Sequence, residues 1–485
     1  MRMRVLFVVR NLQAVEPLGL MYVSAMLRRH GHATRLVSTR GIDLPAQVKA
    51  FDPEVIGYSV CTGQHPYYLG LNRQLKRHHR FISLFGGPHP TFFPQLIEEE
   101  GVDVICRGEG EHAALDLCNR LERREDIRCI PNLWVKADGT ITRNALRPLI
   151  GDLDSLPPPD RQARYEADPQ AREHPTESFL TSRGCPYACS YCFNPAMRQL
   201  YGPGWGKRRI RSPQNVVDEI EQTRAGAALQ FVQFRCSMFP CEEEWLAVFS
   251  GQYRQRIGLP FYCHVRADQI SEEAARLLGE TGCRSVNMGI ECADEHYRRD
   301  VLCRPMSNQT IRDACRRLHE RGIAIMADNM VGLPGRTLED DFATLRFNIE
   351  CGIDYALAMI LQPYPGTGIC DWAVEHGCFD GDPARIDFSY YSGSPLRFGS
   401  AQEKRQIENL QKLFAVGVEA PWLLPLIRRL VRLRPNIIFS SIFRCWMMWC
   451  YHRRLQPYRM PRWQRRETIG AVFGFYPKEA VHEGD

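Results

Sequence analysis

The sequence lacks three features, and each absence excludes a class of protein. No apolar run approaches the roughly 18 to 20 residues that a membrane-spanning helix needs, which excludes an integral membrane protein. No secretory leader precedes the first strand-like run, RVLFVV at residues 4–9, so we expect a reducing cytoplasm. The 19 cysteines are odd in number and scattered, which does not fit a small disulfide framework.

Acidic residues are also missing from one C-terminal stretch. Residues 420–466 contain no Asp, Glu or Lys, but they contain Trp422, Trp446, Trp449 and Trp463. They also carry eleven arginines, at positions 428, 429, 432, 434, 444, 453, 454, 459, 462, 465 and 466. Without this stretch the formal net charge of +6 becomes −5.

A basic segment with tryptophans suits peripheral contact with a membrane interface. A helical cap with its arginines pointing outward is an equally good interpretation. No nucleic acid partner is expected, because the arginines alternate with long aliphatic and aromatic runs instead of forming a solvated basic tract.

The N-terminal third alternates short apolar runs with amphipathic segments. The apolar runs lie at residues 4–9, 33–38, 55–60, 81–87 and 102–108. This alternation predicts an α/β fold with a Rossmann-like, doubly wound parallel sheet over residues 1–150. Ligands of such sheets lie beyond the carboxyl ends of the strands, although a glycine there is more often only a turn residue. The candidates in these loops are Ser59, Thr62, Gly86, Gly87 and Glu109.

A proline-rich linker is expected over residues 151–175, followed by a second βα series. Its strand-like runs begin at residues 177, 229, 261, 285, 323 and 355. Six such repeats predict a partial (β/α)6 TIM-like barrel over 176–384, with its chemistry at the strand C-terminal face. The remaining residues, 385–485, are expected to form a mostly helical region rich in Arg and Trp.

The most specific motif is a cysteine triplet just after the first barrel strand. The run RGCPYACSYC places Cys185, Cys189 and Cys192 in the spacing C-x3-C-x2-C. Three thiolates on one loop can hold three irons of a four-iron cluster and leave the fourth iron open. Zinc is the alternative, but a closed zinc site takes four ligands and no second C-x2-C or H-x3-H pair is present. Incidental burial of the thiols is the remaining alternative.

With this triplet, the sequence resembles the radical S-adenosylmethionine enzymes that carry an N-terminal cobalamin-binding domain, the cobalamin-dependent methylase-like family. The resemblance covers residues 4–377. Besides the triplet with Tyr191 before its last cysteine, it rests on Gly289-Ile290-Glu291, Gly332-Leu333-Pro334-Gly335 and Pro363-Tyr364-Pro365-Gly366-Thr367, in the expected order.

The resemblance implies that Cys185, Cys189 and Cys192 ligate a 4Fe-4S cluster whose open iron is chelated by S-adenosylmethionine. Reduction, by a donor such as flavodoxin or ferredoxin, would then yield methionine and a 5′-deoxyadenosyl radical that abstracts hydrogen from the substrate.

The resemblance also assigns contacts to S-adenosylmethionine. Tyr191 would lie near the adenine, Arg266 and Glu291 would contact the polar groups, and Gly289 and Gly332 would let the cofactor approach the backbone. For Arg266 an ion pair within the barrel is an equal alternative.

The N-terminal domain would bind cobalamin, with Ser59, Thr62, Gly86, Gly87 and Glu109 as contacts. Domains that ligate cobalt through histidine show a D-x-H-x-x-G loop after the first strand, but residues 10–19 contain no histidine. We therefore expect cobalamin without histidine ligation, and His89 as a contact to its phosphate or tail.

Arg235 departs from the family pattern, which often has acidic residues after the second barrel strand. If its guanidinium points into the barrel, it suits a carboxylate or phosphate of the substrate. An ion pair with a neighbouring residue is the alternative.

These features lead to the hypothesis of a cobalamin-dependent radical enzyme that methylates an unactivated carbon of a small-molecule or lipid-like substrate. Cyclisation, rearrangement or oxidation with the same cofactors is one alternative. A non-catalytic cobalamin and iron–sulfur sensor is another, which the complete set of barrel motifs disfavours. We expect a cytoplasmic location, to which residues 420–466 would add peripheral attachment to a membrane.

Overall fold

The computed structural model describes residues 2–12, 16–387, 389–459 and 461, and the chain divides into two compact units. The first unit is Met1–Glu173 with Ala196–Arg211, and the second is His174–Pro195 with Ser212–Asp485. These boundaries differ from the expected ones, since most of the expected linker packs within the first unit. Buried Asp160 fixes it there by accepting a hydrogen bond from Ser24 Oγ (2.6 Å) and pairing with Arg28 (3.0 Å).

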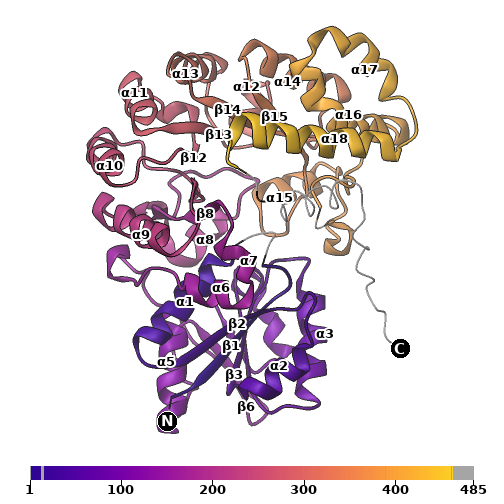
Figure 1. Ribbon diagram of the computed structural model, residues 1–485. Helices are drawn as coiled ribbons and strands as arrows, with labels where there is room; N and C mark the ends of the chain where they lie inside the picture. Colours follow the sequence, from indigo (N-terminus) through magenta and orange to yellow (C-terminus); the bar gives the residue numbers. More distant parts are fainter. Residues whose placement is uncertain (1, 13–15, 388, 460, 462–485) are drawn as a thin grey trace. The chain divides into compact units, whose positions relative to one another are not determined.

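The first unit contains the doubly wound sheet that the sequence predicts. Its strands are β1 (Arg4–Val9), β2 (Ala33–Ser38), β3 (Val55–Ser59), β4 (Ile82–Gly86), β5 (Val104–Cys106), β6 (Leu133–Ala137) and β7 (Thr140–Arg143), in the spatial order β2-β1-β3-β4-β5-β6-β7. Helices α1 (Leu18–Arg29) and α5 (Glu111–Arg123) cover one face, and α2 (Leu44–Phe51) and α3 (His65–Lys76) cover the other (Figure 1). The first five strands are parallel, and the order reverses between β1 and β3, where such sheets bind ligands.

The second unit contains the expected six-stranded parallel series. Its strands are β8 (Thr176–Phe179), β11 (Phe231–Phe234), β12 (Phe261–Val265), β13 (Cys283–Glu291), β14 (Ala324–Val331) and β15 (Tyr355–Ile360), and their order in the sheet is their order in the chain. Helices between them include α9 (Pro213–Gly226), α10 (Glu243–Arg256), α11 (Glu272–Thr281), α13 (Asn308–Glu320) and α14 (Leu338–Glu350). Alternate residues such as Val286 and Met288 join the large apolar core with these helices, and the intervening ones face the opposite side.

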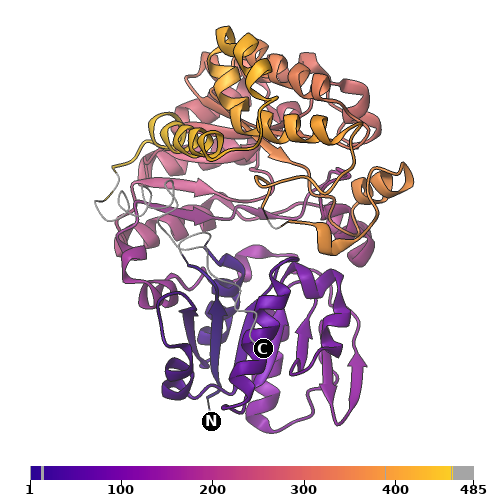
Figure 2. The same cartoon turned by 90° about the vertical axis from the view of Figure 1, so that its right-hand side faces the viewer.

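The C-terminal region is helical, as predicted, and packs with the second unit. Helix α16 (Ala401–Glu419) lies against β15, α17 (Leu424–Leu430) follows it, and α18 (Ile437–Cys450) runs beside α16 (Figures 1 and 2). After α18 the chain turns under the beginnings of the strands. There Ser285 Oγ donates to the Leu455 carbonyl oxygen (2.6 Å), and Gln233 Nε2 donates to Gln456 Oε1 (2.7 Å).

None of the described helices is long and apolar enough to cross a membrane. Arg462, Trp463, Arg465 and Arg466 lie outside the described residues.

Replacing Leu455, whose side chain is fully buried between the barrel strands and α18, should destabilise the second unit. We expect Leu455→Ala to lower the free energy of unfolding by about 3 kcal/mol, since buried Leu-to-Ala changes lose both transfer energy and packing. Exposed Leu433 offers a matched control, for which Leu433→Ala should stay within about 0.5 kcal/mol. Chemical denaturation measures both, and equal effects would contradict the burial of Leu455.

Candidate active site

The three cysteines lie on the loop between β9 (Ser182–Arg183) and α8 (Asn194–Tyr201), directly after the first barrel strand. Cys189 is buried, whereas Cys185 and Cys192 are half-buried. Among the described residues, no three His, Cys, Asp or Glu side chains are arranged to hold a single metal ion. In a four-iron cluster each thiolate binds a different iron, so the three thiols need not converge on one metal position.

Hydrogen-bond donors surround the thiols. Nη1 of Arg266 and Nη1 of Arg304 lie 3.9 Å and 3.8 Å from Cys189 Sγ, and Asn194 Nδ2 lies 3.2 Å from Cys192 Sγ. Burial raises the pKa of Cys185 and of Cys192, while backbone N–H donors oppose that rise. Donors and positive charge of this kind stabilise the thiolates that a cluster requires, so the residues fit such a group.

Arg304 joins the cysteine loop to the end of β13. Its Nη2 donates to the Gly289 carbonyl oxygen (2.8 Å), and its Nε lies 3.8 Å from Glu291 Oε1, which accepts a hydrogen bond from the Tyr191 hydroxyl (2.7 Å). Burial alone would lower the pKa of Arg304, but Tyr191, Glu291 and Cys189 raise it above its usual value. The structure therefore brings the predicted residues Tyr191, Gly289 and Glu291 together around an arginine that the sequence did not single out.

The backbone at Glu291 is strained. Its φ is +68°, which few non-glycine residues adopt, and the pairing of β13 with β14 shifts register between Gly289 and Glu291. A Cβ at Gly289 would lie 2.3 Å from Glu291 Oε1, so only glycine lets that carboxylate turn back over the strand. Strain of this kind concentrates at functional sites.

Arg266 and Gly332 have protein partners as well. Arg266 pairs with Asp268 through both carboxylate oxygens (2.8 and 3.0 Å), and its guanidinium stacks 3.5 Å from the Tyr187 ring centroid. Gly332 has a φ of +66°, and its N–H donates to Asp341, a buried carboxyl whose pKa burial raises. The ion pair that we weighed for Arg266 is present, beside its approach to Cys189.

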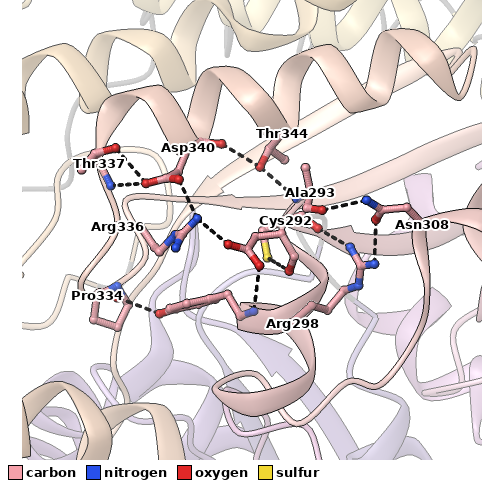
Figure 3. Close-up of polar contacts among 11 residues, drawn as sticks. Cys292, Ala293, Arg298, Asn308, Pro334, Arg336, Thr337, Asp340 and Thr344 are labelled. Atoms are coloured by element: carbon pink, nitrogen blue, oxygen red, sulfur yellow. Dashed lines mark hydrogen bonds and ion pairs between the residues drawn. The ribbon is translucent and has the colours of Figure 1, made fainter.

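A buried arginine holds the loop between Glu291 and Arg304 in place. Arg298 is completely buried and donates to the carbonyl oxygen of Cys292 (2.5 Å) and to Asn308 Oδ1 (2.8 Å) (Figure 3). It also donates to the carbonyl oxygen of Met306 (2.7 Å). Asn308 Nδ2 in turn donates to the Ala293 carbonyl oxygen (3.0 Å). The Arg298 guanidinium therefore helps to hold the loop conformation that positions Arg304.

The same close-up shows a second brace of this loop. Arg336 pairs with Asp294 (2.8 Å) and Asp340 (2.5 Å), and Asp294 caps the N-terminus of α12 (Glu295–Asp300) (Figure 3). Arg336 follows the Gly332-Leu333-Pro334-Gly335 motif, so the motif is connected to the loop after β13.

In the first unit, the predicted cobalamin contacts follow β3 and β4. Gly87 has a φ of +96°, and a Cβ there would lie 2.8 Å from Val60 N and 3.0 Å from Ser59 Oγ. Thr62 Oγ1 lies 3.2 Å from His89 Nδ1, and the His89 ring stacks on His65 at 4.1 Å. Burial lowers the pKa of His89 to about 4, so it is neutral at pH 7. Gly86 ends β4 beside these residues, and residues 13–15 of the first loop lie outside the described ones.

Glu109 has partners within the first unit. Its carboxylate pairs with Arg209 (2.8 Å) and accepts the Ile150 N–H (2.8 Å), so it braces the unit. The cobalamin contact expected at Glu109 stays a prediction. Nearby, a Cβ at Gly108 would overlap the Tyr201 hydroxyl, so Tyr201 and Arg209 of the returning segment both reach this loop.

Sequence reasoning missed three polar residues of the second unit, the buried Arg304 and the half-buried His264 and Asp328. For His264 and Asp328 a signal was available, since each is a titratable residue inside an otherwise apolar strand run. Nothing in the sequence around Arg304 indicates that it folds back onto Cys189.

Comparison with known proteins matches both units. A B12 binding domain model covers residues 5–117, and a Radical SAM superfamily model covers residues 179–347. An uncharacterised methyltransferase of Pyrococcus horikoshii is 27% identical over 371 residues, 74% of this chain and 78% of that protein. An anaerobic magnesium-protoporphyrin IX monomethyl ester cyclase of Rubrivivax gelatinosus is 25% identical over 335 residues, 66% of this chain and 58% of that protein.

Among solved structures, the radical S-adenosylmethionine methyltransferase TsrM of Kitasatospora setae, with tryptophan and an S-adenosylmethionine analogue bound, superposes with a TM-score of 0.65. It is 19% identical, and the match covers 78% of this chain and 76% of that one. At this identity the similarity shows the shared fold.

Replacing Arg298 should weaken the loop that holds Arg304. We expect Arg298→Met to lower the free energy of unfolding by about 3 kcal/mol, because two carbonyl oxygens and Asn308 lose their buried donor. Its neighbour Arg299 is exposed and pairs only locally with Asp300 and His296, so Arg299→Met should change stability by about 0.5 kcal/mol or less. Thermal and chemical unfolding of both variants test this, and a silent Arg298→Met would refute the bracing role.

Proposed function

Because the chain belongs to the radical S-adenosylmethionine superfamily and carries a B12-binding domain, we propose that it methylates an unactivated carbon of a small-molecule or lipid-like substrate. The observation that carries this proposal is the combination of the cysteine loop and its buried arginines with a cobalamin-type domain in one chain. When bound, the cluster supplies the electron that cleaves S-adenosylmethionine, and cobalamin carries the methyl group. Methyltransferases among the relatives support this reaction.

In this proposal Cys185, Cys189 and Cys192 hold the cluster. Arg266 and Arg304 stabilise the negative charge of Cys189, since their guanidinium groups already lie within 4 Å of its sulfur. A one-electron donor such as flavodoxin or ferredoxin reduces the cluster.

S-adenosylmethionine is bound by residues of β13 and the loops beside it. Glu291 accepts a hydrogen bond from its amino group, Tyr191 borders its adenine, and Gly289 and Gly332 leave room beside the backbone. Arg266 contacts the carboxylate of S-adenosylmethionine through Nη1, the guanidinium nitrogen that does not donate to Asp268. The strained backbone at Glu291 supports this assignment, because the strain aims one carboxylate at the cysteine loop.

Cobalamin is held by the loops after β3 and β4. Gly86 and Gly87 allow close approach to the backbone, and Ser59 and Thr62 offer hydroxyl groups. His89 contacts the tail or phosphate of cobalamin as a neutral side chain. Its ring is held in position by stacking on His65 and by its hydrogen bond with Thr62.

Product analysis tests the reaction. With substrate, reductant, cobalamin and S-adenosylmethionine, we expect 5′-deoxyadenosine and S-adenosylhomocysteine in equal amounts together with a methylated product. Formation of 5′-deoxyadenosine alone would refute methyl transfer and favour the cyclisation that the cyclase relatives perform. No cleavage of S-adenosylmethionine at all would favour the sensor.

A Cys189→Ala variant should lose the cluster absorbance, and Cys315→Ala, a buried thiol outside the loop, should keep it.

We also propose peripheral attachment of residues 420–459 to an anionic membrane surface. Eleven large apolar side chains are exposed in the described chain, and six of them lie here: Trp422, Leu426, Leu433, Ile437, Ile438 and Trp449. Trp422 and Ile437 are 78% and 80% exposed, which is unusual for such side chains outside an interaction surface.

The arginines of this segment divide into two groups. Arg428 pairs with Glu339, and Arg454 pairs with Glu419 (2.7 Å), which fixes the segment to the second unit. Arg429, Arg432, Arg434 and Arg453 are exposed and have no acidic partner among the described residues. Exposed apolar side chains with unpaired arginines beside them are complementary to anionic headgroups over an acyl interior.

Vesicle co-sedimentation tests this attachment. We expect the intact protein to bind phosphatidylglycerol vesicles and to bind pure phosphatidylcholine vesicles less, with binding weakened by salt. A Trp422→Ser, Ile437→Ser, Ile438→Ser variant should bind at least about tenfold more weakly, since each side chain contributes roughly 1.5–3 kcal/mol when buried. Val248→Ser, at an exposed apolar site on α10, should bind as the unchanged protein does. Equal sedimentation of all variants would contradict the proposal.

A further inference from the structure

The inner face of the barrel carries a group of polar side chains on four neighbouring strands. Arg235 follows β11, His264 lies on β12, Asn287 on β13 and Asp328 on β14; together they are called the luminal cluster below. Their strand neighbours Cys263, Val265, Val286, Met288 and Ala327 all belong to the apolar core beneath the helices. Because side chains alternate along a strand, the luminal cluster faces the opposite side.

Three atoms of this cluster are shielded from solvent and have no hydrogen-bond partner among the described residues. They are Oδ1 of Asp328, Nε2 of His264 and Oδ1 of Asn287. The other carboxylate oxygen of Asp328 accepts a hydrogen bond from Asn287 Nδ2 (2.9 Å), so the carboxyl group is held in a fixed orientation. A buried polar atom left unpaired costs roughly 1–3 kcal/mol, so three of them on one face indicate a site that something else completes.

Arg235 supplies the charge of the cluster. Its Nε and Nη2 both donate to Gln233 Oε1 (3.0 and 2.6 Å), which turns the guanidinium back along the inside of the barrel toward the Tyr262 ring, 5.7 Å away. No acidic side chain pairs with Arg235 in the described part of the chain, and its side chain is exposed. The ion pair that we weighed from the sequence is therefore absent there, and the charge is available to a bound anion.

The protonation states suit a ligand with more than one polar group. Burial and the charge of Arg235 lower the pKa of His264 to about 4, so it is a neutral hydrogen-bonding group at pH 7. Burial, and then the charge of Glu291, raise the pKa of Asp328 to about 7, so its carboxyl group can donate or accept. Asp328 is thus electrostatically coupled to the S-adenosylmethionine candidate Glu291, and lies directly opposite Gly289 in the sheet.

Apolar side chains border the cluster on the same face. Met326 and Met330 flank Asp328 on β14, and Leu357 lies opposite it on β15. Met326 and Leu357 pack against Phe443 and Leu455 of the C-terminal region, so apolar side chains enclose the cluster on this side.

We propose that Arg235, His264 and Asp328 bind the polar end of the methyl acceptor, with an oxyanion on Arg235 and a hydroxyl or amine hydrogen-bonded to Asp328 and His264. This inference rests on the proposed function, since it identifies the acceptor as a hydroxylated or aminated carboxylate or phosphate. These three are binding residues for the acceptor and take no part in cleaving S-adenosylmethionine.

Binding of small matched probes to the cofactor-loaded full chain tests the proposal without turnover. Glycerol 3-phosphate and glycerate carry an oxyanion and hydroxyl groups, whereas propyl phosphate and propionate carry the oxyanion alone. By calorimetry or saturation-transfer NMR, we expect one hydroxylated probe to bind at least about tenfold more tightly than its matched partner, about 1.4 kcal/mol. Whether the phosphate or the carboxylate pair binds identifies the oxyanion.

Two substitutions separate the roles. Arg235→Met should weaken the binding of the hydroxylated probe and of its matched partner about tenfold or more. Asp328→Leu should remove only the tighter binding of the hydroxylated probe. Arg321→Met, at an exposed arginine directly after α13, should change neither. Unchanged cluster absorbance and melting temperature show that the variants fold.

The proposal is overturned if the unchanged protein binds none of the four probes at millimolar concentration, since the cluster then holds only water. It is also overturned if Asp328→Leu keeps the hydroxyl advantage, or if Arg235→Met binds as tightly as the unchanged protein. The binding experiment measures no product, so the absence of probe binding would leave the methyl-transfer proposal intact. In turn, the absence of a methylated product would not change what the binding experiment shows about the luminal cluster.

Discussion

A single buried charge is the constraint on which the second unit depends. Arg304 is almost wholly buried and must keep its partners, the Gly289 carbonyl oxygen, the Glu291 carboxylate and the sulfur of Cys189. These partners come from the end of β13 and from the cysteine loop, so both must be folded before the guanidinium is satisfied. The cluster loop and the cofactor strand are therefore organised as one piece, and neither can adopt its shape alone.

Much of the fold could be predicted because strands of parallel sheets are buried on both faces and read as continuous apolar runs. The cysteine triplet could be recognised because its spacing is local. The positions of Arg304 and Arg298 could not, since their partners come from other parts of the chain and appear only after folding. The same holds for the protein partner of Glu109, because Arg209, which pairs with its carboxylate, lies one hundred residues later in the chain.

The two faces of the barrel sheet have different tasks, and the contrast is visible strand by strand. Residues toward the helices form one continuous apolar core that supplies stability. Residues on the inner face include Arg235, His264, Asn287 and Asp328, which gain little stability from their positions and leave hydrogen-bonding atoms unpaired. A sequence keeps such groups inside a sheet only when function compensates for their unfavourable burial.

The path of the chain between the units has a consequence for how such proteins are assembled. The chain passes from one unit to the other three times, after residues 173, 195 and 211. The segment Ala196–Arg211 contributes Tyr201 and Arg209 to the first unit, although its residues fall within the span of the radical enzyme. A fragment that ends at Glu173 would therefore leave Glu109 without its arginine. Recombination between relatives must exchange three junctions together, which favours inheritance of the two units as an inseparable pair.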